Sequence, residues 1–196
     1  MNIDRREALA RLVAITGSIA IGAEFFLSGC ERPGKRAVTP FTAADLALMD
    51  EIGDTIIPVT DSPGAKAAGI GAFMAKMVND CYDQDAHAVF QYGLVEIEKA
   101  SEKKHGKSFM TSSPAERTAL LNDLDQEQRA YSRQKTREAP PHYFRLMKEL
   151  TLLGFFSSEV GCTKALRYVE TPGAYHGDVP YKRGDRAWFN PSRRIN

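Results

Sequence analysis

The chain has 196 residues, with 26 lysines and arginines against 25 aspartates and glutamates, and a formal net charge of +1. This near-neutral balance argues against a nucleic-acid partner, because proteins that bind nucleic acids concentrate positive charge on one face. The length is enough for one domain with its own core once a leader segment is set aside.

The beginning of the chain has the composition of a bacterial export signal. Arg5 and Arg6 come first, residues 12–23 carry no charge, and the segment ends on Leu27-Ser28-Gly29-Cys30. A basic start, a short apolar run and small residues before a cut are typical of a secretory signal. The apolar run is too short to span a bilayer. The paired arginines predict the twin-arginine route, which exports proteins that have already folded.

The tetrad that ends in Cys30 has the form of a lipobox, where signal peptidase cuts before a cysteine that carries a diacylglycerol. We therefore expect residues 1–29 to be a twin-arginine lipoprotein-type signal peptide. Residues 30–40, which contain few apolar side chains, are expected to form a flexible tether. The mature protein would then be periplasmic and anchored to the membrane by the lipid on Cys30. Two alternatives stay open: a general-pathway signal, and an uncleaved segment that serves as the anchor.

The rest of the chain predicts helices. Apolar residues recur at helical spacing over residues 42–57, 70–82, 85–104, 114–124 and 142–156. Two starts carry capping signals: Thr42 followed by Asp45, and Ser113-Pro114 followed by Glu116.

The remaining segments of the helical region are less regular. Residues 125–138 are highly charged and are predicted to be either a solvated continuation of the preceding helix or a loop. A short helix through Leu166 and Tyr168 is expected to end near Pro172, and no alternating strand pattern occurs. The sequence therefore predicts an all-α fold, with one domain of five to six helices over residues 41–171.

Residues 172–196 have a different composition from the helical region. Proline and glycine exclude a helix, yet the segment contains Tyr175, Tyr181, Arg186 and the only tryptophan of the chain, Trp188. Disordered tails are poor in aromatic residues, whereas Tyr, Trp and Arg dominate the anchors of protein interfaces. We predict an extended tail that binds a partner through these four side chains. The alternative is a tail that packs back over its own helices.

The cysteines and histidines offer no recognisable redox or metal motif. With Cys30 acylated, Cys81 and Cys162 remain; they could form a disulfide with each other or with a partner chain, or stay as buried thiols. His87, His105, His142 and His176 lie far apart in the sequence and have no metal-ligand spacing.

The sequence also has no phosphate-binding loop, dinucleotide fingerprint or nucleophile elbow. Asp50, Glu51 and Asp54 have the spacing of a solvated helix face, and Glu159 is most simply a capping or solvent-facing acid. We therefore predict no catalytic, cofactor-binding or metal-binding residue in this chain.

Four stretches of the chain resemble one protein family. Residues 50–58 and 60–69, the latter Thr-Asp-Ser-Pro-Gly-Ala-Lys-Ala-Ala-Gly, are similar to the opening block of the gluconate 2-dehydrogenase subunit 3 family. Residues 147–161 are similar to a later block, and residues 172–188, which end in Arg-Ala-Trp, to the closing one. The likeness extends over about residues 41–188, and the closing block is the most specific.

The resemblance implies a non-catalytic small subunit of a periplasmic sugar or sugar-acid dehydrogenase complex. In such complexes a large flavoprotein of the glucose–methanol–choline type carries FAD, and a cytochrome c subunit with haem c accepts the electrons. The small subunit supplies the export signal for its folded partner. Two other functions stay open: a free-standing lipoprotein enzyme that uses Glu159 or a histidine, and an anchored binding module without a dehydrogenase partner.

Overall fold

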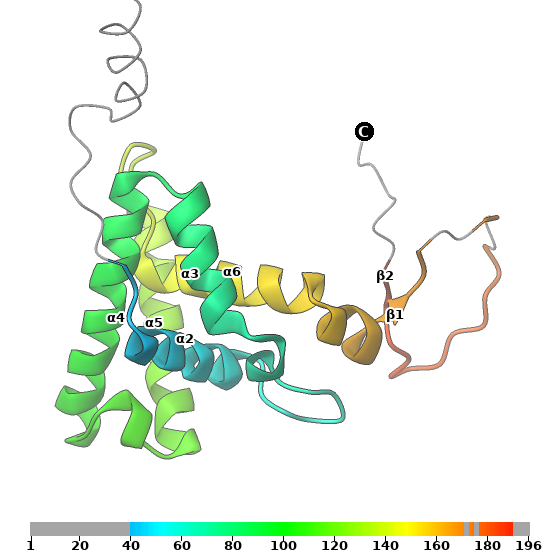
Figure 1. Ribbon diagram of the computed structural model, residues 1–196, viewed down its shortest axis with the longest axis horizontal. Helices are drawn as coiled ribbons and strands as arrows, with labels where there is room; N and C mark the ends of the chain where they lie inside the picture. Colours follow the sequence, from blue (N-terminus) through cyan, green and yellow to red (C-terminus); the bar gives the residue numbers. More distant parts are fainter. Residues whose placement is uncertain (1–39, 171–172, 175–176, 190–196) are drawn as a thin grey trace, which may run out of the picture. The chain divides into compact units, whose positions relative to one another are not determined.

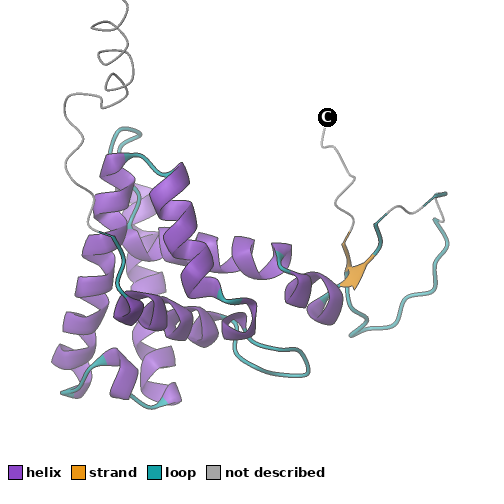
Figure 2. Cartoon of the chain, viewed as in Figure 1, coloured by secondary structure: helices purple, strands orange, loops and turns teal. Residues whose placement is uncertain are grey.

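The computed structural model describes residues 40–170, 173–174 and 177–189. Its α-helices are α2 (Ala43–Ile56), α3 (Ile70–Cys81), α4 (Gln84–His105), α5 (Pro114–Gln134) and α6 (Tyr143–Ser157). Shorter turns of helix are η1 (Ala65–Ala68), η2 (Phe109–Thr111) and the π-helical turn η3 (Gly161–Ala165). Figures 1 and 2 show these helices and the short strand pair that follows them. The predicted all-α, single-domain fold is confirmed.

The two predicted capping boxes are both present. The amide of Asp45 donates to Thr42 Oγ1 at 3.2 Å, and the amide of Thr42 donates to Asp45 Oδ2 at 2.8 Å. Ser113 and Glu116 form the same reciprocal pair at the start of α5. Each box satisfies amides that a helix start otherwise leaves unpaired, so these local signals determine where α2 and α5 begin.

Helix α5 is longer than its apolar pattern alone indicated. It continues to Gln134, so the first ten residues of the charged stretch that starts at Asp125 are helical. Within this stretch Asp125 forms an ion pair with Arg129 one turn later, at 2.7 Å, and Gln128 is buried. Charge pairs at this spacing support a helix whose exposed face is polar. The alternative of a solvated continuation is therefore correct up to Gln134.

Helix α6 lies at the centre of the packing. It contacts α2, α3, α4 and α5. Its buried residues are Phe144, Leu146, Met147, Leu150, Thr151, Gly154 and Phe155. Glycines allow close approach at two crossings: a Cβ on Gly93 of α4 would lie 2.6 Å from Tyr143 Cβ, and one on Gly154 would lie 2.5 Å from Phe73 Cδ1. The short distances show that no larger residue fits at these positions without displacing a neighbour.

The segment after α6 corrects one expectation and adds a short strand pair. The helix expected through Leu166 and Tyr168 is wrong: η3 ends at Ala165, and Leu166 is extended. Arg167–Tyr168 then form β1, which pairs in parallel with β2, Trp188–Phe189. The pairing joins positions twenty-one residues apart, and strands of two residues are too short to show an alternating pattern.

The acidic residues of α2 do not lie on a purely solvated face. Asp50 Oδ1 accepts a 2.7 Å hydrogen bond from the amide of Gly71, at the start of α3. This bond is important because Gly69, the residue before α3, supplies no side-chain cap. Asp54 Oδ1 accepts from the amide of Lys66 at 3.3 Å. Both carboxylates therefore fasten the loop between α2 and α3.

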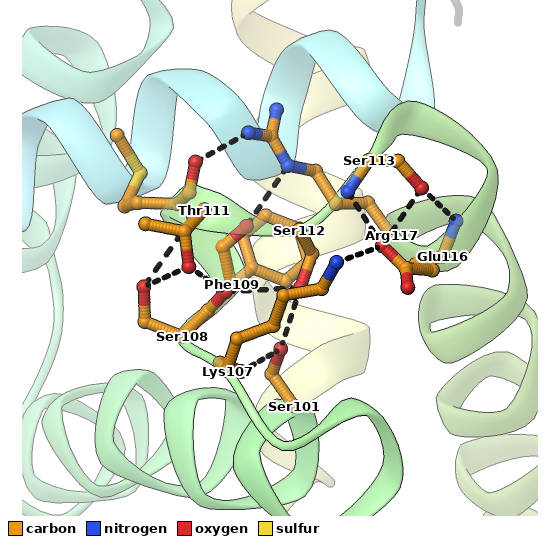
Figure 3. Close-up of polar contacts among 10 residues, drawn as sticks. Ser101, Lys107, Ser108, Phe109, Thr111, Ser112, Ser113, Glu116 and Arg117 are labelled. Atoms are coloured by element: carbon orange, nitrogen blue, oxygen red, sulfur yellow. Dashed lines mark hydrogen bonds and ion pairs between the residues drawn. The ribbon is translucent and has the colours of Figure 1, made fainter.

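The third acid of α2, Glu51, forms an ion pair with Lys66 at 2.8 Å and another with Arg117 of α5. The hydrogen bond from Lys66 and the positive charge of Arg117 hold the pKa of Glu51 below its ordinary value. Arg117 also donates from Nε to the carbonyl of Phe109 at 2.9 Å and from Nη2 to that of Met110 at 2.6 Å. Figure 3 shows how the guanidinium spans the η2 turn. One side chain thus joins α2, η2 and α5.

Replacing Arg117 by methionine should lower the free energy of unfolding of the mature chain by about 2–3 kcal/mol, because two carbonyls lose this donor and Glu51 loses one of its two cationic partners. Urea unfolding followed by circular dichroism measures this. The difference should shrink as the pH falls from 4.5, the ordinary pKa of Glu51, through the lower pKa that Glu51 has in the folded state, because protonation of Glu51 then removes the charge of the pair.

The matched control is Arg129→Ala. Arg129 also forms an ion pair with a carboxylate, but 61% of its side chain is exposed against 13% for Arg117. Its loss should change stability by less than about 0.5 kcal/mol. Equal effects of the two substitutions would contradict the role given to Arg117.

Candidate functional site

Four predicted functional residues lie outside the described residues. They are Arg5 and Arg6 of the export signal, the lipidation residue Cys30, and Tyr175 of the tail. The structure therefore bears only on Tyr181, Arg186 and Trp188, and on the two remaining cysteines.

The strand pair fastens the tail to the segment that follows α6. The amide of Arg167 donates to the carbonyl of Ala187 at 2.8 Å, and that of Val169 donates to Phe189 at 3.1 Å. The guanidinium of Arg167 lies 5.2 Å from the centre of the Trp188 ring and forms an ion pair with Asp185 at 3.2 Å. Backbone pairing, a cation–π contact and an ion pair therefore coincide at one place.

Arg186 contacts its own chain. Its Nη1 donates to the carbonyls of Lys164 at 2.8 Å and Thr163 at 3.3 Å. Both carbonyls belong to η3, whose end would otherwise leave them without a partner inside the helix. The contacts of Arg186 match the alternative interpretation, in which the tail packs against the chain's own helices. Arg186 is therefore in the position of a residue that holds the tail in place.

The two aromatic residues of the described tail remain open to solvent. Tyr181 is 75% exposed and Trp188 is 59% exposed. They line a hollow of about 500 Å³ together with Val179, Pro180 and Arg167. Large aromatic rings beside arginine are the chemistry of interface anchors. The described part of the tail therefore separates into a fastened base and an exposed aromatic surface.

The two cysteines do not pair with each other in this structure. Cys81 is exposed at the end of α3, and Cys162 is buried in η3. The thiol of Cys162 lies 3.2 Å from the carbonyl of Phe156, as a donor, so it is held inside its own turn. A disulfide with another chain stays a prediction, and of the two thiols in the alternative of buried thiols only Cys162 is buried.

The other residues considered for chemistry are in separate surroundings. His87 is buried, with Nε2 3.1 Å from Asn79 Oδ1, and burial lowers its pKa. His142 starts α6 and Glu159 is exposed. Among the described residues, no cluster of His, Cys, Asp or Glu is arranged to hold a metal ion. Over the same residues, no helix combines the length and apolar character needed to cross a membrane.

A second hollow, of about 390 Å³, was not expected from the sequence. It lies between α5 and α6, where Arg129, Ser132 and Arg133 face Arg145 and Lys148. The hollow depends on the continuation of α5 beyond Asp125, which the sequence pattern left open between helix and loop. The four-residue spacing of Arg129 and Arg133 was the available signal, since it places both on one helix face.

Comparison with known families gives one match. Residues 43–173 match the family model described as gluconate 2-dehydrogenase subunit 3. No curated protein and no solved structure matches the chain. The matched range includes every described α-helix, η3 and β1.

Replacing Arg186 by alanine should loosen the strand pair without affecting the helices. The carbonyls of Thr163 and Lys164 lose their donor, so amide hydrogen exchange over residues 161–168 and 186–189 should accelerate about tenfold or more. Exchange in α2 to α6 should stay unchanged. Arg183→Ala, in the exposed turn that precedes Arg186, is the control. If amide exchange over these residues has the wild-type rate in both variants, Arg186 does not hold the tail.

Proposed function

The chain belongs to the gluconate 2-dehydrogenase subunit 3 family, and from this we propose that it is the non-catalytic small subunit of a periplasmic, flavin-dependent sugar or sugar-acid dehydrogenase complex. Its partners are a large glucose–methanol–choline-type flavoprotein that carries FAD and a cytochrome c subunit that carries haem c. The match over residues 43–173 carries the proposal, since it extends over the whole helical domain. The chain itself contributes binding, export and attachment.

The proposed export role follows from how a flavoprotein matures. A flavin is inserted in the cytoplasm, so the large subunit must fold there before it crosses the membrane. The twin-arginine route accepts folded cargo, and Arg5 and Arg6 form the signal for it in this chain. The small subunit therefore escorts the large one by binding it before export. The lipid on Cys30 then anchors the complex to the membrane.

The exposed part of the tail supports the proposed contact with the large subunit. Tyr181 and Trp188 offer large, rigid rings beside a hollow, which suits insertion against a partner. Arg186, which binds carbonyls of its own chain, is better assigned to fastening the tail than to contacting the partner. Tyr175 stays a predicted contact. The proposal therefore places the anchor at the aromatic residues.

Substituting Arg5 and Arg6 together by lysine should leave the flavoprotein in the cytoplasm. The flavoprotein is co-expressed with each variant, and its amount in the periplasm is measured by immunoblot and by flavin fluorescence. Export should fall about tenfold or more, because the signal belongs to the small subunit alone in this scheme. Arg11→Lys, inside the same segment, is the control. Unchanged periplasmic flavoprotein in the double variant would contradict the escort role.

The substitution Cys30→Ala tests the anchor separately. Without the lipid, a chain whose signal has been removed should move with the complex from the membrane fraction to the soluble fraction. Mass spectrometry distinguishes this chain from one with an intact signal. A wild-type chain that carries no lipid, or a Cys30→Ala chain that has lost its signal and is still equally membrane-bound, would show that attachment comes from another subunit.

A further inference from the structure

One stripe of α6 changes from charged to apolar along the helix. Arg145, Glu149, Leu152 and Phe156 are spaced by four, three and four residues, so they lie above one another on one side. All four are exposed. In the first half of α6 the stripe consists of charged residues, which are usual on the exposed side of a surface helix. In the second half it is apolar.

The second half of α6 is therefore apolar on both sides. Thr151, Gly154 and Phe155 are buried, while Leu152, Leu153 and Phe156 point outward and are exposed. Leu153 is 52% exposed. A helix that is apolar all round is normally covered on every side. Helix α6 reaches this part as it leads from α2–α5 toward η3 and the strand pair, as Figure 1 shows.

The hollow between α5 and α6 adjoins this apolar stripe and is cationic. Leu152 itself lines it, together with Arg129, Arg133, Arg145 and Lys148. Asp125 forms ion pairs with Arg129 at 2.7 Å and with Lys148 at 2.6 Å, and Glu149 does so with Arg145 at 2.7 Å. Four cations face two carboxylates, so a positive charge remains.

Two polar groups of the hollow have no partner among the described residues. The guanidinium of Arg133 forms no hydrogen bond or ion pair there, and the hydroxyl of Ser132 is buried without a hydrogen-bond partner. A buried polar atom left unsatisfied is unfavourable, so a partner group that pairs with Ser132 would stabilise this part of the hollow. A carboxylate could accept hydrogen bonds from both Ser132 and Arg133.

We propose that the outer face of α6, from the cationic hollow to Phe156, binds an acidic and apolar segment of the flavoprotein large subunit. A carboxylate of that segment enters the hollow at Ser132 and Arg133, and its apolar residues cover Leu152, Leu153 and Phe156. This inference rests on the proposed function, because it assigns a second contact to the same partner. It adds a site on the helical domain that is separate from the tail.

Charge favours a different protein over a second copy of this chain. A symmetric dimer through this face would bring the same cationic hollow of two copies to one interface, and like charges there are unfavourable. A flat anionic lipid surface would meet the exposed cations but would not reach the buried hydroxyl of Ser132. A protruding carboxylate side chain can enter the hollow that Ser132 and Arg133 line, which a flat surface cannot.

The test measures the affinity of the purified, delipidated mature chain for the flavin-loaded large subunit. Leu152→Asp places a negative charge under the apolar residues of the segment and beside its carboxylate, and Arg133→Glu reverses the charge of the cation that has no partner. Each should raise Kd about tenfold or more. Val95→Asp is the matched control, since Val95 is also an exposed apolar residue but lies on α4, and it should leave Kd within about twofold. Circular dichroism and thermal unfolding verify that each variant is folded.

The outcomes separate this inference from the proposed function. If both variants bind the large subunit with the affinity of the wild type, the α6 site is overturned and the proposed function stands. No complex between the wild-type chains contradicts the proposed function itself. The two variants could instead abolish a dimer of the mature chain while the complex with the large subunit persists, which would assign the face to a second copy. They could likewise abolish binding to anionic vesicles, which would assign the face to lipid. Either result would also overturn the inference.

Discussion

The close packing of α6 against its four neighbours is the constraint on which the rest of the structure depends. Glycine at positions 93 and 154 lets α4 and α3 come near enough to bury its aromatic and aliphatic side chains. Since α6 also leads directly into η3 and β1, its position determines where the tail begins. The carboxylates of α2 and the guanidinium of Arg117 act on a different part, where they fix the loops that bring α3 and α5 against the same core.

Local signals predicted the helices well, because caps act within four residues of sequence. Thr42 with Asp45 and Ser113 with Glu116 form the expected boxes. The errors occur where the partner of a residue is distant. The carboxylate of Asp50 caps a helix that starts twenty residues later, and β1 pairs with a strand beyond the tail loop. Neither relation leaves a periodic trace in the sequence.

The candidate site shows the same division. Composition singled out Tyr181, Arg186 and Trp188 together, because all three types are common at interfaces. The three-dimensional structure is needed to distinguish the guanidinium, which binds its own chain, from the two rings, which remain exposed. The outer face of α6 was hidden for another reason: a run of apolar residues predicts burial, but it does not tell which of them the chain's own helices cover. Leu153 and Phe155 are two residues apart and differ completely in exposure.

The strand pair has a thermodynamic consequence for the tail. Closing a loop of about twenty residues costs roughly 2–3 kcal/mol of chain entropy. The closure is offset by two backbone hydrogen bonds, the two bonds of Arg186 and the ring contact of Trp188. These terms are of similar size, so the closed loop has a small margin of stability. Any molecule that binds Tyr181 and Trp188 in the closed form therefore shifts the equilibrium between open and closed loop toward the closed form. Binding and loop closure are thermodynamically linked in this way.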